Sequence, residues 1–111
     1  MPEHRRIELR REINGADQRF LDASLNWSGD LIIEGHDLGP STTPVSSDGE
    51  YEWIRTIRAG DIPALMSLLG ASPDADVLDV LRDQWSGTAS YELERLIRHG
   101  NVPSELSVWT G

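Results

Sequence analysis

The sequence predicts an α+β fold in which an antiparallel sheet of four or five strands, beginning as an N-terminal meander, is packed on one face by about three C-terminal helices. Three observations predict this fold. Residues 5–58 contain stretches that alternate between apolar and polar side chains, as half-buried strands do. Residues 61–100 contain apolar stripes with helical spacing. The strands also precede the helices without regular alternation, which disfavours a parallel sheet.

The length of the chain indicates one domain. At 111 residues, the chain is long enough to bury a single hydrophobic core and too short to bury two. We therefore expect residues 1–111 to form a single domain, with a short C-terminal segment at residues 103–111 after the helices.

The first three expected strands follow one another across short turns. Strict alternation in the strand from Arg6 to Ile13 places one set of side chains on one face: Ile7, Leu9, Arg11 and Ile13. Asn14 and Gly15 then supply turn chemistry, and the second strand has its own set on one face: Leu21, Ala23, Leu25 and Trp27. After a turn at residues 28–30, Leu31 begins a third strand that should pair antiparallel with the second.

A polar segment from Leu38 to Gly49 is expected to be the longest loop, and a fourth strand should run from about Glu50 to Arg58. Neither face of this strand is cleanly apolar. Alternation therefore leaves two arrangements open. Either Tyr51 and Trp53 face the core, or Ile54 does and the two aromatic rings are exposed.

Three helices are expected in the second half. The first has Asp61 as its N-cap and Pro63 in its first turn, and it ends at Gly70. Ser72 should cap the second helix, with Pro73 at its first position. The third should run from near Thr88 to Gly100, with acidic residues early and basic residues late, as the helix dipole favours. The segment from Glu105 to Trp109 then returns as an edge strand or lies across the helices.

The composition narrows the range of partners. The formal net charge is −9, and all ten basic residues are arginines. An acidic body repels phosphate backbones, so we expect a basic protein partner and no direct contact with nucleic acid. The alternative is that the acidity only keeps the protein soluble. The chain has no cysteine and no run of apolar residues long enough to span a bilayer, so we expect a cytoplasmic protein without membrane contact.

No residue pattern predicts catalysis, a cofactor or a metal. His4, His36 and His99 lie far apart, and none has a metal-binding spacing. His36 and Asp37 are adjacent, so in a strand they should point to opposite faces and would not cooperate. The acidic run at residues 74–83 lacks the glycine and the bidentate acid of a calcium loop. We therefore expect no catalytic residue, no cofactor and no metal ligand.

A partner-binding surface is expected around the third and fourth strands and the loop between them. Acidic residues gather there and alternate with aromatic ones, and a basic partner would find both buried area and paired hydrogen bonds. The expected partner-binding residues are Asp30, Glu34, His36, Asp37, Asp48, Glu50, Tyr51, Glu52 and Trp53. The competing interpretation is that Tyr51 and Trp53 belong to the core while Glu50 and Glu52 only face water.

Three segments carry a resemblance to a known class of proteins: SGDLIIEGHDLG (residues 28–39), GEYEWIRTIRAGDIPALMSLLG (residues 49–70) and HGNVPSELSVW (residues 99–109). Together they resemble small acidic actinobacterial immunity proteins of polymorphic-toxin systems, including contact-dependent growth inhibition. The segments contain no diagnostic catalytic motif, so the resemblance assigns no residue a role. It implies a cytoplasmic bacterial protein that binds a cognate toxin domain and blocks it, and a basic nuclease-type toxin fits the acidity of the chain.

Two other functions remain open from the sequence. An acidic adaptor or nucleic-acid mimic would have a similar charge but would accept many basic partners. A small enzyme of an unrecognised type would need a concave site with a carboxylate or histidine of shifted pKa.

Overall fold

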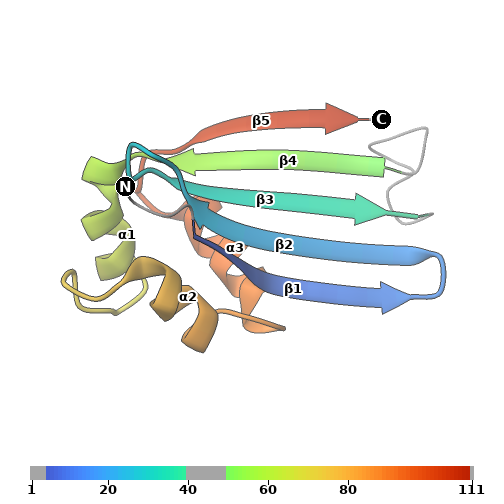
Figure 1. Ribbon diagram of the computed structural model, residues 1–111, viewed down its shortest axis with the longest axis horizontal. Helices are drawn as coiled ribbons and strands as arrows, with labels where there is room; N and C mark the ends of the chain where they lie inside the picture. The colour runs from blue at the N-terminus through green and yellow to red at the C-terminus, as the bar shows by residue number, and fades with distance from the viewer. Residues whose placement is uncertain (1–4, 40–49, 111) are drawn as a thin grey trace.

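The computed structural model describes residues 5–39 and 50–110, with the backbone alone described for Trp109 and Thr110. Five strands form one antiparallel sheet in the order β1-β2-β3-β4-β5 (Figure 1). The strands are β1 (Arg6–Asn14), β2 (Asp17–Leu25), β3 (Leu31–Leu38), β4 (Glu50–Ile57) and β5 (Glu105–Thr110). Three helices lie between β4 and β5 in the sequence: α1 (Ile62–Leu68), α2 (Val77–Gln84) and α3 (Ala89–His99). The predicted α+β fold is confirmed, and the C-terminal segment is an edge strand.

The helices lie on one side of the sheet. Figure 1 shows α3 behind the strands, with α1 and α2 beside the end where β1 begins and β4 ends. The buried apolar side chains of the sheet and the helices form one core, which includes Leu21, Ile33 and Ile57 from the strands and Leu78 and Leu93 from the helices. We call this side of the sheet the helix face. No described helix covers the other side, which we call the open face.

A β-bulge changes the expected pattern of β1. The pairing of β1 with β2 shifts its register between Glu8 and Arg10, so the strict alternation predicted for this strand is wrong. Leu9 and Arg10 are consecutive and both are buried, with 2% and 4% of their surfaces exposed. The alternation is inverted beyond the bulge, and Arg11 and Ile13 are therefore exposed instead of sharing the face of Ile7.

Arg10 ties β1 to α3. Its Nε donates a hydrogen bond to Ser90 Oγ at 2.9 Å, and its Nη2 forms an ion pair with Glu94. The guanidinium also lies over the ring of Tyr91, with its central carbon 3.6 Å from the ring centroid. A buried guanidinium requires such partners, because the desolvation of an unpaired charge is costly.

The second strand ends earlier than predicted. Alternation holds through Leu25, but Trp27 lies in the turn that follows and is 64% exposed, so it is not a core residue. Asn26 shapes this turn, because its side-chain oxygen accepts hydrogen bonds from the backbone N–H groups of Ser28 and Asp30. The turn chemistry therefore ends the strand before Trp27 can continue the alternation.

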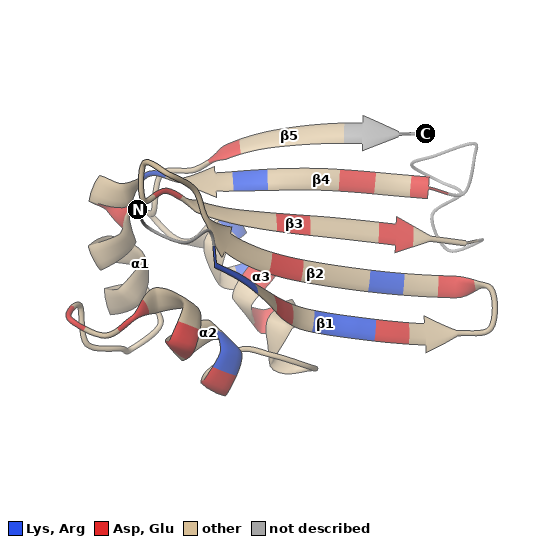
Figure 2. Ribbon diagram, in the orientation of Figure 1, with Lys and Arg blue, Asp and Glu red and all other residues tan. Residues whose placement is uncertain are grey.

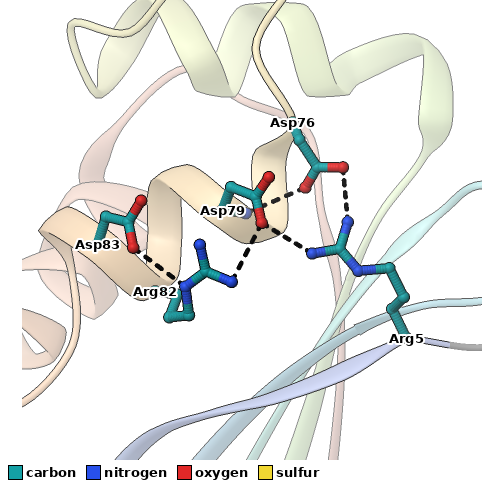
Figure 3. Close-up of polar contacts among 5 residues, drawn as sticks. All are labelled: Arg5, Asp76, Asp79, Arg82 and Asp83. Atoms are coloured by element: carbon teal, nitrogen blue, oxygen red, sulfur yellow. Dashed lines mark hydrogen bonds and ion pairs between the residues drawn. The ribbon is translucent and has the colours of Figure 1, made fainter.

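The second helix begins four residues after the predicted position. Ser72 Oγ accepts a hydrogen bond from Asp74 N–H at 3.3 Å within a turn, whereas the N-cap of α2 is Asp76, which accepts from Asp79 N–H at 3.0 Å. Arg5 then bridges the two aspartates, with 2.6 Å to Asp76 and 2.8 Å to Asp79 (Figure 3). The N-cap aspartate and its bridge to Arg5 hold the first turn of α2 beside the start of β1.

The other two helices follow the prediction closely. The first helix has Pro63 near its start, although Asp61 makes no side-chain cap, and a 3₁₀ turn at Ala59–Asp61 leads into it. The third begins after Thr88, ends before Gly100 and has Arg98 and His99 in its last turn. None of the helices within residues 5–39 and 50–110 is long and apolar enough to cross a membrane.

Candidate functional site

The structure divides the expected partner-binding residues between the two faces of the sheet. Strand registers place Glu34, His36, Glu50 and Glu52 on the open face, as Glu34 pairs with Ile54 and His36 pairs with Glu52. The helix face receives Asp37, Tyr51 and Trp53, which line one groove. Asp30 lies in the turn before β3, and Asp48 lies outside the described residues.

The strand registers show on which face of the sheet Tyr51 and Trp53, the aromatic residues of β4, lie. Trp53 packs against the hydrophobic core and lies directly over Gly35, where a Cβ atom would approach Trp53 Cε2 within 2.2 Å. Tyr51 lies on the same face two residues earlier, and Ile54 lies on the open face. Acids and aromatic rings alternate along β4, but they belong to two separate surfaces.

On the open face, His36 and two glutamates form a cluster. His36 Nε2 lies 3.0 Å from Glu50 Oε1 and 3.2 Å from Glu52 Oε1, because β3 and β4 place the three residues side by side. Their side chains are 37%, 41% and 47% exposed, so the cluster is accessible to a partner. Phe20 supports it from β2, with its ring centroid 6.4 Å from that of His36.

A second charged cluster adjoins the first. Arg6 donates to Asp22 at 2.6 Å and to Glu34 at 3.2 Å, and so joins β1, β2 and β3 across the open face. A shallow hollow of about 270 Å³ lies between this group and His36, and Glu8, Glu52 and Ile54 are among the residues that line it. Carboxylates on adjacent strands therefore surround the hollow.

Acidic side chains dominate the described part of the open face. Figure 2 shows acidic positions on β2, β3 and β4 side by side across the sheet. By register, the acids of this face are Glu8, Asp22, Glu34, Glu50, Glu52 and Glu105, and the arginines are Arg6 and Arg11. Alternation along each strand could have indicated Glu8 and Asp22, but the pairing that joins them to Glu34 depends on the strand registers.

The His36 cluster can be considered as a catalytic or a metal-binding site. The hollow beside it is lined by no serine, threonine or tyrosine, so a hydroxyl nucleophile is not among its described residues. The ligand atoms of His36, Glu50 and Glu52 lie within 4.8 Å of one another, which one divalent cation could bridge. A hydrogen bond between the imidazole and Glu50, with Glu52 Oε1 3.2 Å from the same ring nitrogen, accounts for the same spacing. The cluster presents two carboxylates at the surface of the open face.

On the helix face, Asp37, Tyr51 and Trp53 line a groove between α3 and strands β3 to β5. The sequence did not point to two further residues of this groove, Arg55 and Arg98. No local sequence pattern joins them, because they are far apart in the sequence and lie in different elements. Burial raises the pKa of Asp37, which opposes its ionisation. Burial, together with the positive charge of Arg98, lowers the pKa of Arg55.

Asp30 has a structural role. It is 6% exposed, and its Oδ1 accepts a hydrogen bond from Ala59 N–H at 2.9 Å. Its Oδ2 accepts from Asn26 and from Arg58, each at 3.4 Å. These contacts join the turn before β3 to the chain after β4. The carboxylate is therefore occupied within the fold and offers little surface to a partner.

The hydrogen bonds of Asp30 should make stability depend on pH. The bond from Ala59, with those from Asn26 and Arg58, lowers the pKa of Asp30. The unfolded value is about 3.9, so the stabilisation is present above that pH and is lost as pH falls through the folded-state pKa. Asp30→Asn should reduce stability at neutral pH and flatten its loss between about pH 4 and pH 2. Urea unfolding across that range measures this effect, with the exposed Asp83→Asn as control; equal acid dependence in all three proteins would contradict it.

Comparisons with known proteins assign no family to this chain, so its class has to be argued from its own residues. No protein-family model matches the chain, and no curated protein or solved structure matches it either. The resemblance to immunity proteins therefore stays a prediction. What the molecule offers is a sheet with an acidic open face and, on the opposite face, a groove containing arginines and aromatic rings.

Proposed function

We propose that this chain is an immunity protein, which binds and neutralises a cognate toxin domain with a basic surface of the nuclease type. The observation that supports the proposal best is the acidic open face, where six carboxylates accompany two arginines among the described residues. Such a face attracts a basic surface and can occupy the positions that phosphates would take. Binding there would block the toxin's access to its substrate.

The open face has other properties of an interface. Its described side chains are partly or fully exposed apart from Ser24, which is 3% exposed. Apolar residues lie among the acids, including Phe20, Ile32 and Ile54, and they supply area for burial. The acids sit on paired strands instead of loops, so little ordering entropy would be lost on binding.

Arg6 and His36 give the open face a fixed pattern of charge. Arg6 holds Asp22 and Glu34 in place, and His36 holds Glu50 and Glu52. Preorganised carboxylates can receive arginine or lysine side chains in defined positions. This pattern favours one cognate partner over the many basic partners that an adaptor or nucleic-acid mimic would accept.

The direct test is protection of growth. A toxin domain encoded beside this chain should stop growth when expressed alone, and co-expression of this chain should restore growth. The purified domain and this chain should form a stable complex. If the domain is toxic and this chain neither protects nor binds, the immunity function is wrong.

Charge reversal locates the interface. The triple substitution Glu8→Lys, Glu50→Lys and Glu52→Lys should slow association with the toxin domain at least about tenfold at low salt, because steering by the open face is lost. Stopped-flow or surface-binding kinetics measure the rate, and salt should narrow the difference from the unmodified chain.

The matched control alters exposed acids on α2, on α3 and in the turn before α2 instead. Asp74→Lys, Asp83→Lys and Glu92→Lys produce the same change in net charge away from the open face. Thermal unfolding verifies that both triple variants are folded. Equal slowing by the two variants would show that total charge, and not the open face, controls binding.

A further inference from the structure

The groove on the helix face is a second site, separate from the acidic open face. It has a volume of about 240 Å³ and lies between α3 and the strands β3, β4 and β5. Its apolar wall is formed by Trp53, Leu93, Ile97 and Leu106. Leu106 and Val108, two residues apart on the same face of β5, are 52% and 45% exposed, so apolar surface continues from the groove along the edge strand.

Two arginines from different elements line this groove. Arg55 comes from the middle of β4 and Arg98 from the last turn of α3. Arg55 Nη1 donates to Ser104 Oγ at 2.8 Å, and neither arginine forms an ion pair with a carboxylate in the described part of the chain. Most other arginines of this acidic protein do form such pairs, including Arg5, Arg6, Arg10 and Arg58.

The positive charge of Arg55 is costly where it lies. Burial and the charge of Arg98 both lower its pKa, which means that the surroundings disfavour the ionised guanidinium. An anion between the two arginines would relieve their repulsion and would supply the missing acceptor. The planar guanidinium matches a carboxylate well, because both oxygens can accept parallel hydrogen bonds.

The rest of the groove limits the ligand. Asp37 and Glu94 also line it, and their charges disfavour an anion with more than one negative charge. Glu94 is already paired with Arg10, so a single negative charge meets less opposition from it. The volume is below the range of roughly 300–1,000 Å³ that is usual for drug-sized ligands. The apolar wall favours a ligand with an apolar body beside its charge.

We infer that this groove binds a monocarboxylate with a small apolar or aromatic body, its carboxylate held by Arg55 and Arg98 and its body against Trp53 and Leu106. A free small acid and the carboxylate at the end of a peptide share this chemistry. The site lies on the face opposite the acidic surface, so it stands whether or not the proposed immunity function is correct.

The test uses phenylacetate as the probe and the amide signals of the full chain in NMR titrations. Phenylacetate should shift the signals of residues 53–55, 93–98 and 106–108, with a dissociation constant on the order of 1 mM for a ligand of this size. Phenylacetamide has the same shape without the charge and should bind at least about tenfold more weakly. Inorganic phosphate, which carries more charge, should also bind more weakly.

Two variants separate the groove from general charge. Arg98→Gln removes an exposed side chain, so the fold should persist, and phenylacetate binding should weaken at least about tenfold. Arg82→Gln is the matched control, because Arg82 is also an exposed helical arginine but pairs with Asp83 on α2. Equal binding by the two variants, equal shifts with phenylacetamide, or no shifts in the groove up to about 20 mM phenylacetate, well above the expected constant, would overturn the inference.

A peptide arm distinguishes the two sources of the carboxylate. An acetylated Gly-Gly-Phe peptide with a free C-terminus is compared with its amidated form and with phenylacetate. Binding of the free peptide at least about tenfold tighter than phenylacetate would support a chain end as the ligand, because the added backbone can pair with the exposed edge of β5. Equal or weaker binding would support a small acid. If the amidated peptide bound as well as the free one, the carboxylate assignment would be wrong.

Discussion

Replacing Arg10 with alanine should lower the free energy of unfolding by about 3–5 kcal/mol, the range found when one partner of a buried ion pair is removed. Arg10 is 4% exposed and contacts Ser90, Tyr91 and Glu94 of α3. Its loss leaves the partly buried carboxylate of Glu94 without its cation and removes the packing of the guanidinium on the ring. Urea denaturation monitored by circular dichroism measures the change.

Arg11 provides the matched control for Arg10. The two arginines are consecutive, but the bulge in β1 leaves Arg11 exposed while Arg10 is buried. Arg11→Ala should therefore change stability by no more than about 0.5 kcal/mol, as surface substitutions usually do. A larger loss from Arg11→Ala than from Arg10→Ala would mean that β1 has the strict alternation and not the bulge.

Substitution of Gly35 by alanine should cost about 2–3 kcal/mol, because overpacking of a well-filled site forces neighbours to move. An added Cβ would lie 2.2 Å from Trp53 Cε2 and Nε1, far inside van der Waals contact. The ring must leave its position over the strand, so the near-ultraviolet circular dichroism of tryptophan should change together with the unfolding midpoint. Phenylacetate binding in the groove should weaken as well, since Trp53 forms part of its wall.

A double-mutant cycle assigns the cost to the contact between Gly35 and Trp53. In a Trp53→Leu background, Gly35→Ala should cost at least about 1 kcal/mol less than in the unmodified protein, because contacting residues are not additive. Gly60→Ala is the control for a change from glycine, since an added Cβ there meets no atom within 4 Å. Equal costs of Gly35→Ala in both backgrounds would show that the ring is not the obstacle.

The fold was predictable because most of its elements have local causes. Alternation and turn residues define β2 and β3, and an apolar stripe with ordered charges defines α3. The errors have causes that a simple residue pattern does not express. The extra residue of the bulge at Leu9 inverts the alternation of β1, and Asp76, which caps α2 in place of Ser72, also pairs with Arg5 from the far end of the sequence.

The candidate site was less predictable, since it depends on how separate strands are aligned. Closeness in the sequence groups the residues of β3 and β4, and it places Glu52 with Trp53 although successive residues point to opposite faces. The packing of Trp53 over Gly35 could not be inferred from β4 alone, where neither face is cleanly apolar. Arg55 and Arg98 line the same groove only because α3 packs across the sheet.

The edge position of β5 has a consequence for the order in which the molecule assembles. Strands β1 to β4 follow one another in both the sequence and the sheet, so each pairing closes a local connection. The pairing of Thr56 with Glu105 encloses all three helices, and loop closure costs more conformational entropy as the enclosed segment grows. The four-strand meander can therefore form early, whereas β5 and the outer wall of the groove should join the native state late and open first.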